Sequence, residues 1–185
     1  MDTGMMIAIA VGVVALLAAL AVWAYRRNTS DGRELKSTFG SEYDRTLDRS
    51  RDEDAAREDL RDRLDRRERF EVRELDDTER ERYADRWTSI QREFVDDPER
   101  AVRDADQVIQ DVMRTRGYPV EDFEQRAKDL SVDHPEVVER YRQGRRLLDR
   151  SERVPTEDHR EAMVHYRALF EELVGTPVGS HRDDR

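Results

Sequence analysis

An uncharged apolar run near the N-terminus, residues 5–25, constrains the fold more than any other feature of the sequence. At about 1.5 Å rise per residue, a helix of this length spans roughly 31 Å, against a hydrocarbon core of about 30 Å. Buried core helices usually show only about 10–14 apolar residues in a row. Because a lone segment in lipid satisfies its backbone only as a helix, the run predicts one transmembrane helix.

The ends of the run support this prediction. Aromatic residues with a polar edge occupy its C-terminal end, where such rings prefer the headgroup level. Two arginines follow directly, whereas Asp2 is the only charged side chain before the run. The residues expected to form the anchor are Met5, Ile7, Val11, Gly12, Leu16, Leu20, Trp23, Tyr25, Arg26 and Arg27.

The orientation follows from the flanking cations. The positive-inside rule places residues 1–4 outside the cell membrane and residues from 26 onward in the cytoplasm. A cleaved secretory signal is the alternative, since Ala19-Leu20-Ala21 resembles a cleavage site, and the protein would then be extracytoplasmic or secreted. Such signals normally carry a cation before a shorter apolar stretch, which favours the anchor.

Small residues recur along one face of the run, at Gly4, Ala8 and Gly12. Such stripes let two membrane helices approach closely, so the helix offers a possible route to self-association. Chance placement among the many alanines of this run explains the stripe equally well.

Beyond the run, the chain is polar and acidic. Charged residues make up 42% of the sequence, and the formal net charge is −10. An acidic surface repels phosphate backbones, which argues against nucleic acid as a partner. The sequence contains no cysteine, which excludes disulfides, thiolate nucleophiles and cysteine-based zinc sites.

Residues 26–75 read as a charged juxtamembrane linker containing a long helix. Acid-to-arginine pairs four residues apart, such as Glu53 with Arg57, support an exposed helix by about 0.2–0.5 kcal/mol each. A helix this polar is expected to be a solvated spacer that packs along one thin edge. An interaction arm that docks on a partner is the alternative.

Residues 76–174 show recurring helix start and stop signals. Thr78 and Glu81 have the spacing of a capping box, Asp97 with Pro98 marks another start, and Gly117 marks a stop. Apolar residues recur at helical spacing between such signals, and no useful strand alternation occurs. We therefore predict an all-α fold, with a bundle of about five short helices over 76–174 and a disordered tail over 175–185.

Sequence motifs for catalysis, cofactor binding or metal binding are not found, so we expect no enzyme and assign no cofactor. One candidate ligand or interaction site consists of Tyr118, Asp122, Asp133 and His134. These residues cluster around two helix starts, whose free N–H groups can hold anions. Asp133 is expected to cap a helix, and the side chain of its neighbour His134 is expected to lie near the surface. The alternative is that all of them are ordinary turn and cap residues.

Four stretches of the soluble region carry a family resemblance: FGSEYDRT (39–46), RYADRWTSIQREFVDDP (82–98), RGYPVEDFEQRAKDLSVDHPEVVERYR (116–142) and MVHYRALFEELV (163–174). In these stretches the chain resembles single-span proteins of high-GC bacteria that are described as membrane or, in some cases, secreted proteins. The resemblance implies a shared helical fold and brings no activity, cofactor or catalytic residue with it.

The combination of anchor, polar spacer and helical bundle favours a membrane-anchored, non-enzymatic interaction or scaffold protein. Its expected partners are the lipid bilayer, through the N-terminal helix, and an unidentified protein. A small-ligand sensor or enzyme within the bundle is the second hypothesis, and an extracytoplasmic envelope protein is the third.

Overall fold

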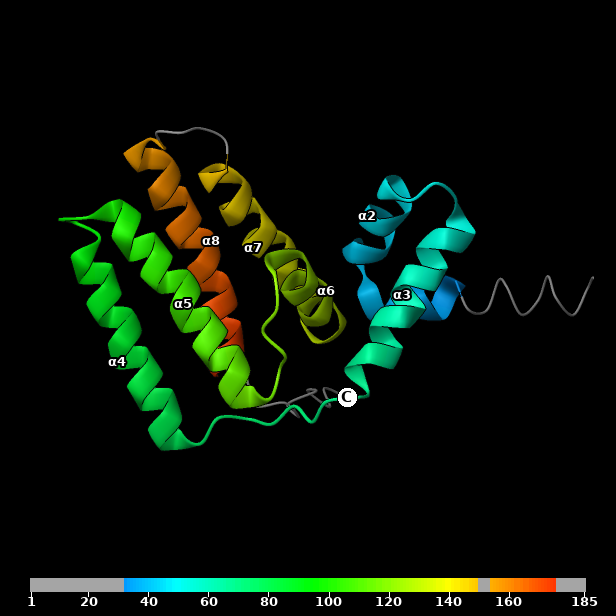
Figure 1. Cartoon of the computed structure of the whole chain (residues 1–185), viewed down its shortest axis with the longest axis horizontal. Helices are drawn as coiled ribbons and strands as arrows, with labels where there is room; N and C mark the ends of the chain where they lie inside the picture. The colour runs from blue at the N-terminus through cyan, green and yellow to red at the C-terminus, as the bar shows by residue number, and fades with distance from the viewer. Residues whose placement is uncertain (1–31, 150–153, 176–185) are drawn as a thin grey trace, which may run out of the picture.

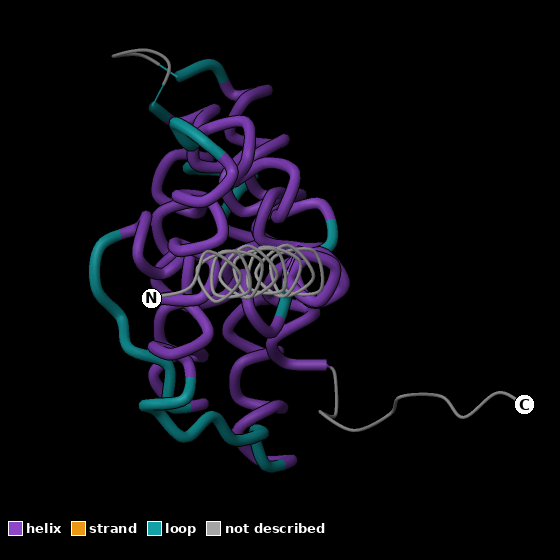
Figure 2. Tube along the Cα trace, turned by 90° about the vertical axis from the view of Figure 1, so that its right-hand side faces the viewer, coloured by secondary structure: helices purple, strands orange, loops and turns teal. Residues whose placement is uncertain are grey.

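The computed structural model describes residues 32–149 and 154–175, and the predicted transmembrane helix lies outside these ranges. The described residues are helical or loop throughout, without a strand, which confirms the all-α prediction (Figures 1 and 2). None of the helices in these ranges is both long and apolar enough to cross a bilayer. Residues 32–39 are helical, and the helices that follow are α2 (Ser41–Arg49), α3 (Glu53–Arg67), α4 (Asp77–Glu93), α5 (Pro98–Arg116), α6 (Phe123–Asp133), α7 (Pro135–Leu148) and α8 (Thr156–Gly175).

Side-chain caps define most of the helix starts. Asp97 caps α5 ahead of Pro98, as predicted, and accepts a hydrogen bond from the Arg100 N–H. The capping box of α4 is formed by Asp76 and Glu79, so the predicted box two residues later is wrong. The earlier pair prevails because Asp76 already satisfies the first free N–H groups of the helix.

The main core is built by helices α4 to α8, and in Figure 1 α5 lies between α4 and α8. Trp87 of α4 stacks on Phe170 of α8, with ring centroids 4.4 Å apart. Gly144 of α7 faces inward as its helical position indicates, and a Cβ atom there would lie 2.8 Å from the Tyr166 ring. The glycine therefore allows α7 and α8 to pack closely.

A second, smaller core joins residues 32–39, α2 and α3, which together form the N-terminal unit (residues 32–67). Its buried members are Leu35, Phe39, Tyr43 and Leu60. The single long helix predicted for this segment is divided instead. Gly40 adopts a positive φ of 51° before α2, and Asp52 caps a new helix.

The N-terminal unit is not the largely solvated spacer that its charge indicated. It docks on the bundle, where α2 contacts α7 and α3 contacts α6. Glu42, only 1% exposed, accepts hydrogen bonds from Arg63 at 2.7 Å and from both Nη atoms of Arg142 at 2.7 and 2.9 Å. The prediction of a solvated spacer is wrong because charged side chains can be buried when they pair with opposite charges. The partners of Glu42 are far from it in the sequence, so the pairing leaves no periodic pattern there.

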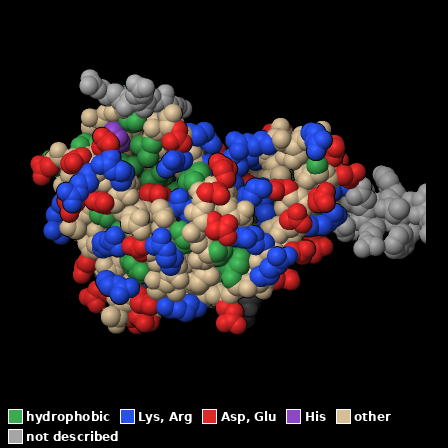
Figure 3. Space-filling view, in the orientation of Figure 1, with side chains coloured by type: hydrophobic (Ala, Val, Ile, Leu, Met, Phe, Trp, Pro, Cys, Tyr) green, Lys and Arg blue, Asp and Glu red, His purple; other side chains and the backbone are tan. Residues whose placement is uncertain are grey.

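The rim of this interface is also ionic. Lys128 of α6 bonds Asp59 of α3 at 2.6 Å, and Arg45 of α2 bonds Glu139 of α7 at 3.0 Å. Basic and acidic side chains intermingle over the visible face of both parts (Figure 3). The N-terminal unit and the bundle are thus joined mainly by charge pairs.

Candidate functional site

The loop between α5 and α6 meets the segment between α3 and α4. Gly117 ends α5 with a φ of 94°, in the left-handed region that favours glycine. A Cβ atom at this position would lie 2.1 Å from the Glu71 carbonyl oxygen, so the two segments touch through their backbones. Next to this contact, the Arg73 N–H donates to the Arg116 carbonyl at 2.8 Å.

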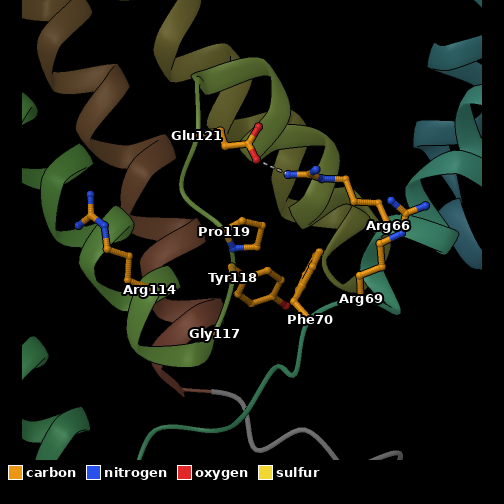
Figure 4. Close-up of a pocket in the computed structure, with 8 residues that line it drawn as sticks. All are labelled: Arg66, Arg69, Phe70, Arg114, Gly117, Tyr118, Pro119 and Glu121. Atoms are coloured by element: carbon orange, nitrogen blue, oxygen red, sulfur yellow. Dashed lines mark hydrogen bonds and ion pairs between the residues drawn. The ribbon is translucent and has the colours of Figure 1, made fainter.

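A hollow of about 370 Å³ opens beside this crossing, and we call it the basic groove (Figure 4). Its apolar surface comes from Phe70, Tyr118 and Pro119, whereas Arg66 and Arg69 on one side and Arg114 on the other supply its charge. The lining residues are Arg66, Arg69, Phe70, Arg114, Gly117, Tyr118, Pro119 and Glu121.

The three arginines of the groove differ in their partners. Arg66 bonds Glu121 at 2.7 Å and Asp129 at 2.9 Å, and Arg114 bonds Asp111 at 2.6 Å. Arg69 is exposed and has no ion pair with any residue of the described ranges. One cation of the groove is therefore free to bind an external anion.

Behind the groove, the Tyr118 hydroxyl belongs to a cluster that joins four segments of the chain. It donates to Asp133 at 2.6 Å, and the same carboxylate oxygen accepts from Arg67 Nε at 2.5 Å. The Tyr118 oxygen also lies 3.4 Å from His134 Nε2, while His134 Nδ1 lies 3.1 Å from Glu172 of α8. Asp133 therefore joins the Tyr118 hydroxyl to the end of α3, and the neighbouring His134 makes the link to α8 through Glu172.

Burial governs the protonation of this cluster. It raises the pKa of the Tyr118 hydroxyl, and the charge of Asp133 raises it further, so Tyr118 remains a proton donor. Burial lowers the pKa of His134, and the opposing hydrogen bond with Glu172 does not reverse the shift. A neutral imidazole then donates its Nδ1–H to Glu172. These groups hold the loop in place and leave no activated nucleophile there.

The structure brings together three of the four residues that the sequence singled out. Tyr118, Asp133 and His134 form the cluster, whereas Asp122 is exposed and caps α6 through the Gln125 N–H. The expected surface position of His134 is wrong, because the side chain is only 7% exposed. Its Nδ1–H draws it inward to Glu172, and Asp133 binds Arg67 instead of capping α7.

Sequence reasoning missed the groove itself. The only local signal is the run of arginines before Phe70, which has the same appearance as the rest of the charged segment. Its other wall comes from residues 114–121, and only the fold places the two together. Within the described ranges, no group of three or more acidic or histidine side chains could hold a metal ion.

Fold and site together define an all-α protein with a basic, aromatic-lined groove. Comparison of the chain with protein-family models, with curated proteins and with solved structures gives no match.

Proposed function

We propose that this protein is a membrane-anchored, non-enzymatic helical interaction protein whose basic groove binds an acidic segment of a partner protein. The observation that carries the proposal is Arg69, an exposed arginine without an ion-pair partner in the described ranges, beside the apolar surface of Phe70 and Pro119. Arginine and aromatic side chains are the residues that contribute most to binding at protein interfaces.

Charge favours an acidic segment as the occupant. Arg66 and Arg114 already pair with carboxylates, so Arg69 supplies the unpaired positive charge of the groove, although the chain as a whole is acidic. An acidic partner is repelled by the net negative charge of the chain and attracted to Arg69, which favours one orientation. An acidic residue pairs with Arg69, and an apolar neighbour packs on Phe70.

The anchor places this groove near a membrane. Residues 5–25 supply the proposed transmembrane helix, and the cations after it favour a cytoplasmic N-terminal unit and bundle. Since the buried Glu42 pairs fix the N-terminal unit on the bundle, residue 32 and the groove have a defined separation. A partner bound in the groove is then held close to the lipid surface.

Photo-crosslinking in intact membranes tests the groove. A photoreactive residue at Glu121, on the groove rim, is expected to form an adduct with a partner segment rich in Asp and Glu. Arg69→Glu should reduce this adduct by about tenfold or more, because a pairing cation becomes a repelling anion. Arg100→Glu, the same charge change at an exposed site on α5 outside the groove, should leave it unchanged.

A photoreactive residue at Val164, 59% exposed on α8, serves as the control position and should not capture the same protein. An adduct at Glu121 that persists at full yield in the Arg69→Glu chain would refute the proposed groove. A crosslinked segment that is basic or uncharged would do the same.

A further inference from the structure

A second, smaller hollow lies next to the basic groove, and Tyr118 lines both. We call it the inner cavity. Its volume is about 160 Å³, below the roughly 300–1,000 Å³ typical of sites for drug-sized ligands. It is therefore suited to a small molecule or ion. Its polar walls include Arg67, Arg73, Arg116, Tyr118, Asp133 and His134.

Arg116, at the end of α5, is the most unusual of these residues. It is only 1% exposed, and its Nε and Nη1 atoms donate to the carbonyls of Arg73 at 3.2 Å and Leu173 at 3.1 Å. Its remaining nitrogen, Nη2, has no acceptor among residues 32–149 and 154–175. The side chain is thus held by the two carbonyls and by the Tyr118 ring, whose centroid lies 5.8 Å from Arg116 Cζ, and it forms no ion pair with a carboxylate of the described ranges.

The other buried arginines of the described ranges differ from Arg116 in having ion-pair partners. Each of them forms an ion pair with a carboxylate, and Arg116 alone does not. The paired residues are Arg57, Arg63, Arg126 and Arg142, with Glu53, Glu42, Asp106 and Glu42 as their respective partners. Because an unpaired buried charge is strongly unfavourable, an anion at Arg116 would stabilise the fold.

The cavity walls do not supply that anion. Asp133 is occupied by Arg67 and the Tyr118 hydroxyl. Arg73 adds a second cation, which is paired with Glu79 on the outside. Glu74 also lines the cavity, but it forms no ion pair with Arg116. Arg116 therefore lines the cavity without an ion pair to any carboxylate of the described ranges.

We propose that the inner cavity binds a small oxyanion, a single phosphate or carboxylate group, with Arg116 as its principal ligand. Charge-assisted hydrogen bonds from a guanidinium to such groups are among the strongest in proteins. The proposal does not depend on the partner-binding role of the groove, since it concerns a different ligand and a different arginine.

Calorimetric titration of the full chain in detergent tests the site. Inorganic phosphate and acetate are titrated separately, against chloride at constant ionic strength and pH. We expect saturable binding of at least one anion, and the anion that binds identifies the phosphate or carboxylate class. Arg116→Gln should weaken it by about tenfold or more, since a charged hydrogen bond is lost.

Arg69→Gln is the matched control, because Arg69 lines the groove and not the inner cavity. Its affinity should equal that of the wild type. If Arg69→Gln abolishes binding while Arg116→Gln does not, the anion binds in the groove and the proposal is wrong. Circular dichroism checks the fold of Arg116→Gln. Should that chain not fold, Arg73→Gln decides, and unchanged affinity there, or no saturable binding to the wild type, overturns the proposal.

Discussion

Replacing Glu42 by glutamine is expected to destabilise the full chain by about 3–5 kcal/mol, the cost typical of breaking a buried ion pair from one side. The carboxylate is 1% exposed and neutralises both Arg63 and Arg142, which are themselves 7% and 3% exposed. Its removal leaves Arg142 with only Glu139, at 3.9 Å, and leaves Arg63 with only Asp59 as a charged partner. The free energy of unfolding, measured in urea with the protein in detergent, checks this value.

Glu139→Gln is the matched control at the rim of the same interface. Glu139 bonds Arg45 and Arg146, but its side chain is one-third exposed, so we expect a loss of about 1 kcal/mol or less. Equal losses for the two variants would contradict the structural role given to Glu42.

The pH dependence of stability separates the charge of Glu42 from its packing. Burial alone raises the pKa of this carboxyl, but the hydrogen bonds from Arg142 and Arg63 outweigh burial and lower it overall. The stability that the ionised group contributes is complete above its ordinary value of 4.5 and is lost as the pH falls through the lowered value in the folded protein. The difference between wild type and Glu42→Gln should therefore shrink on acidification.

Gly117→Ala is expected to destabilise the chain by about 2–5 kcal/mol. An alanine pays about 1–2 kcal/mol to adopt the left-handed conformation, and overpacking adds about 1–3 kcal/mol. The overpacking arises because the new Cβ would lie 2.1 Å from the Glu71 carbonyl oxygen, where backbone and not a flexible side chain must move. Urea unfolding of the full chain measures the effect.

Gly175→Ala is the control for this substitution. A Cβ at Gly175, the last residue of α8, meets no atom of the described residues within 4 Å, so we expect a change of about 0.5 kcal/mol or less. A Gly117→Ala chain as stable as Gly175→Ala would show that the segments around the groove do not touch as described.

The bundle could be predicted from the sequence because its signals are local. Asp97 with Pro98 starts a helix, Gly117 ends it, and Gly144 faces a neighbouring helix, all as their positions indicate. The docking of the N-terminal unit could not be predicted in this way. Glu42 and Arg142 are 100 residues apart, and nothing local distinguishes them from the many solvated charges around them.

The candidate site was predicted in part for the same reason. Tyr118, Asp133 and His134 are close in sequence and meet across one short helix. Asp122 caps the start of α6 by accepting a hydrogen bond from the Gln125 N–H, so its side chain lies outside the cluster. The basic groove combines residues near 66–70 with residues 114–121, and such a pairing becomes visible only once the chain is folded.

The proposed role of the protein depends most directly on residues 5–25 holding the chain on a bilayer. Ultracentrifugation of lysed cells without detergent measures this, with the intact N-terminus verified by mass spectrometry. We expect the full, uncleaved chain in the membrane pellet after high-salt and alkaline washes, and its release by detergent. Recovery of that same intact chain in the supernatant would contradict the proposed anchor and the role built on it.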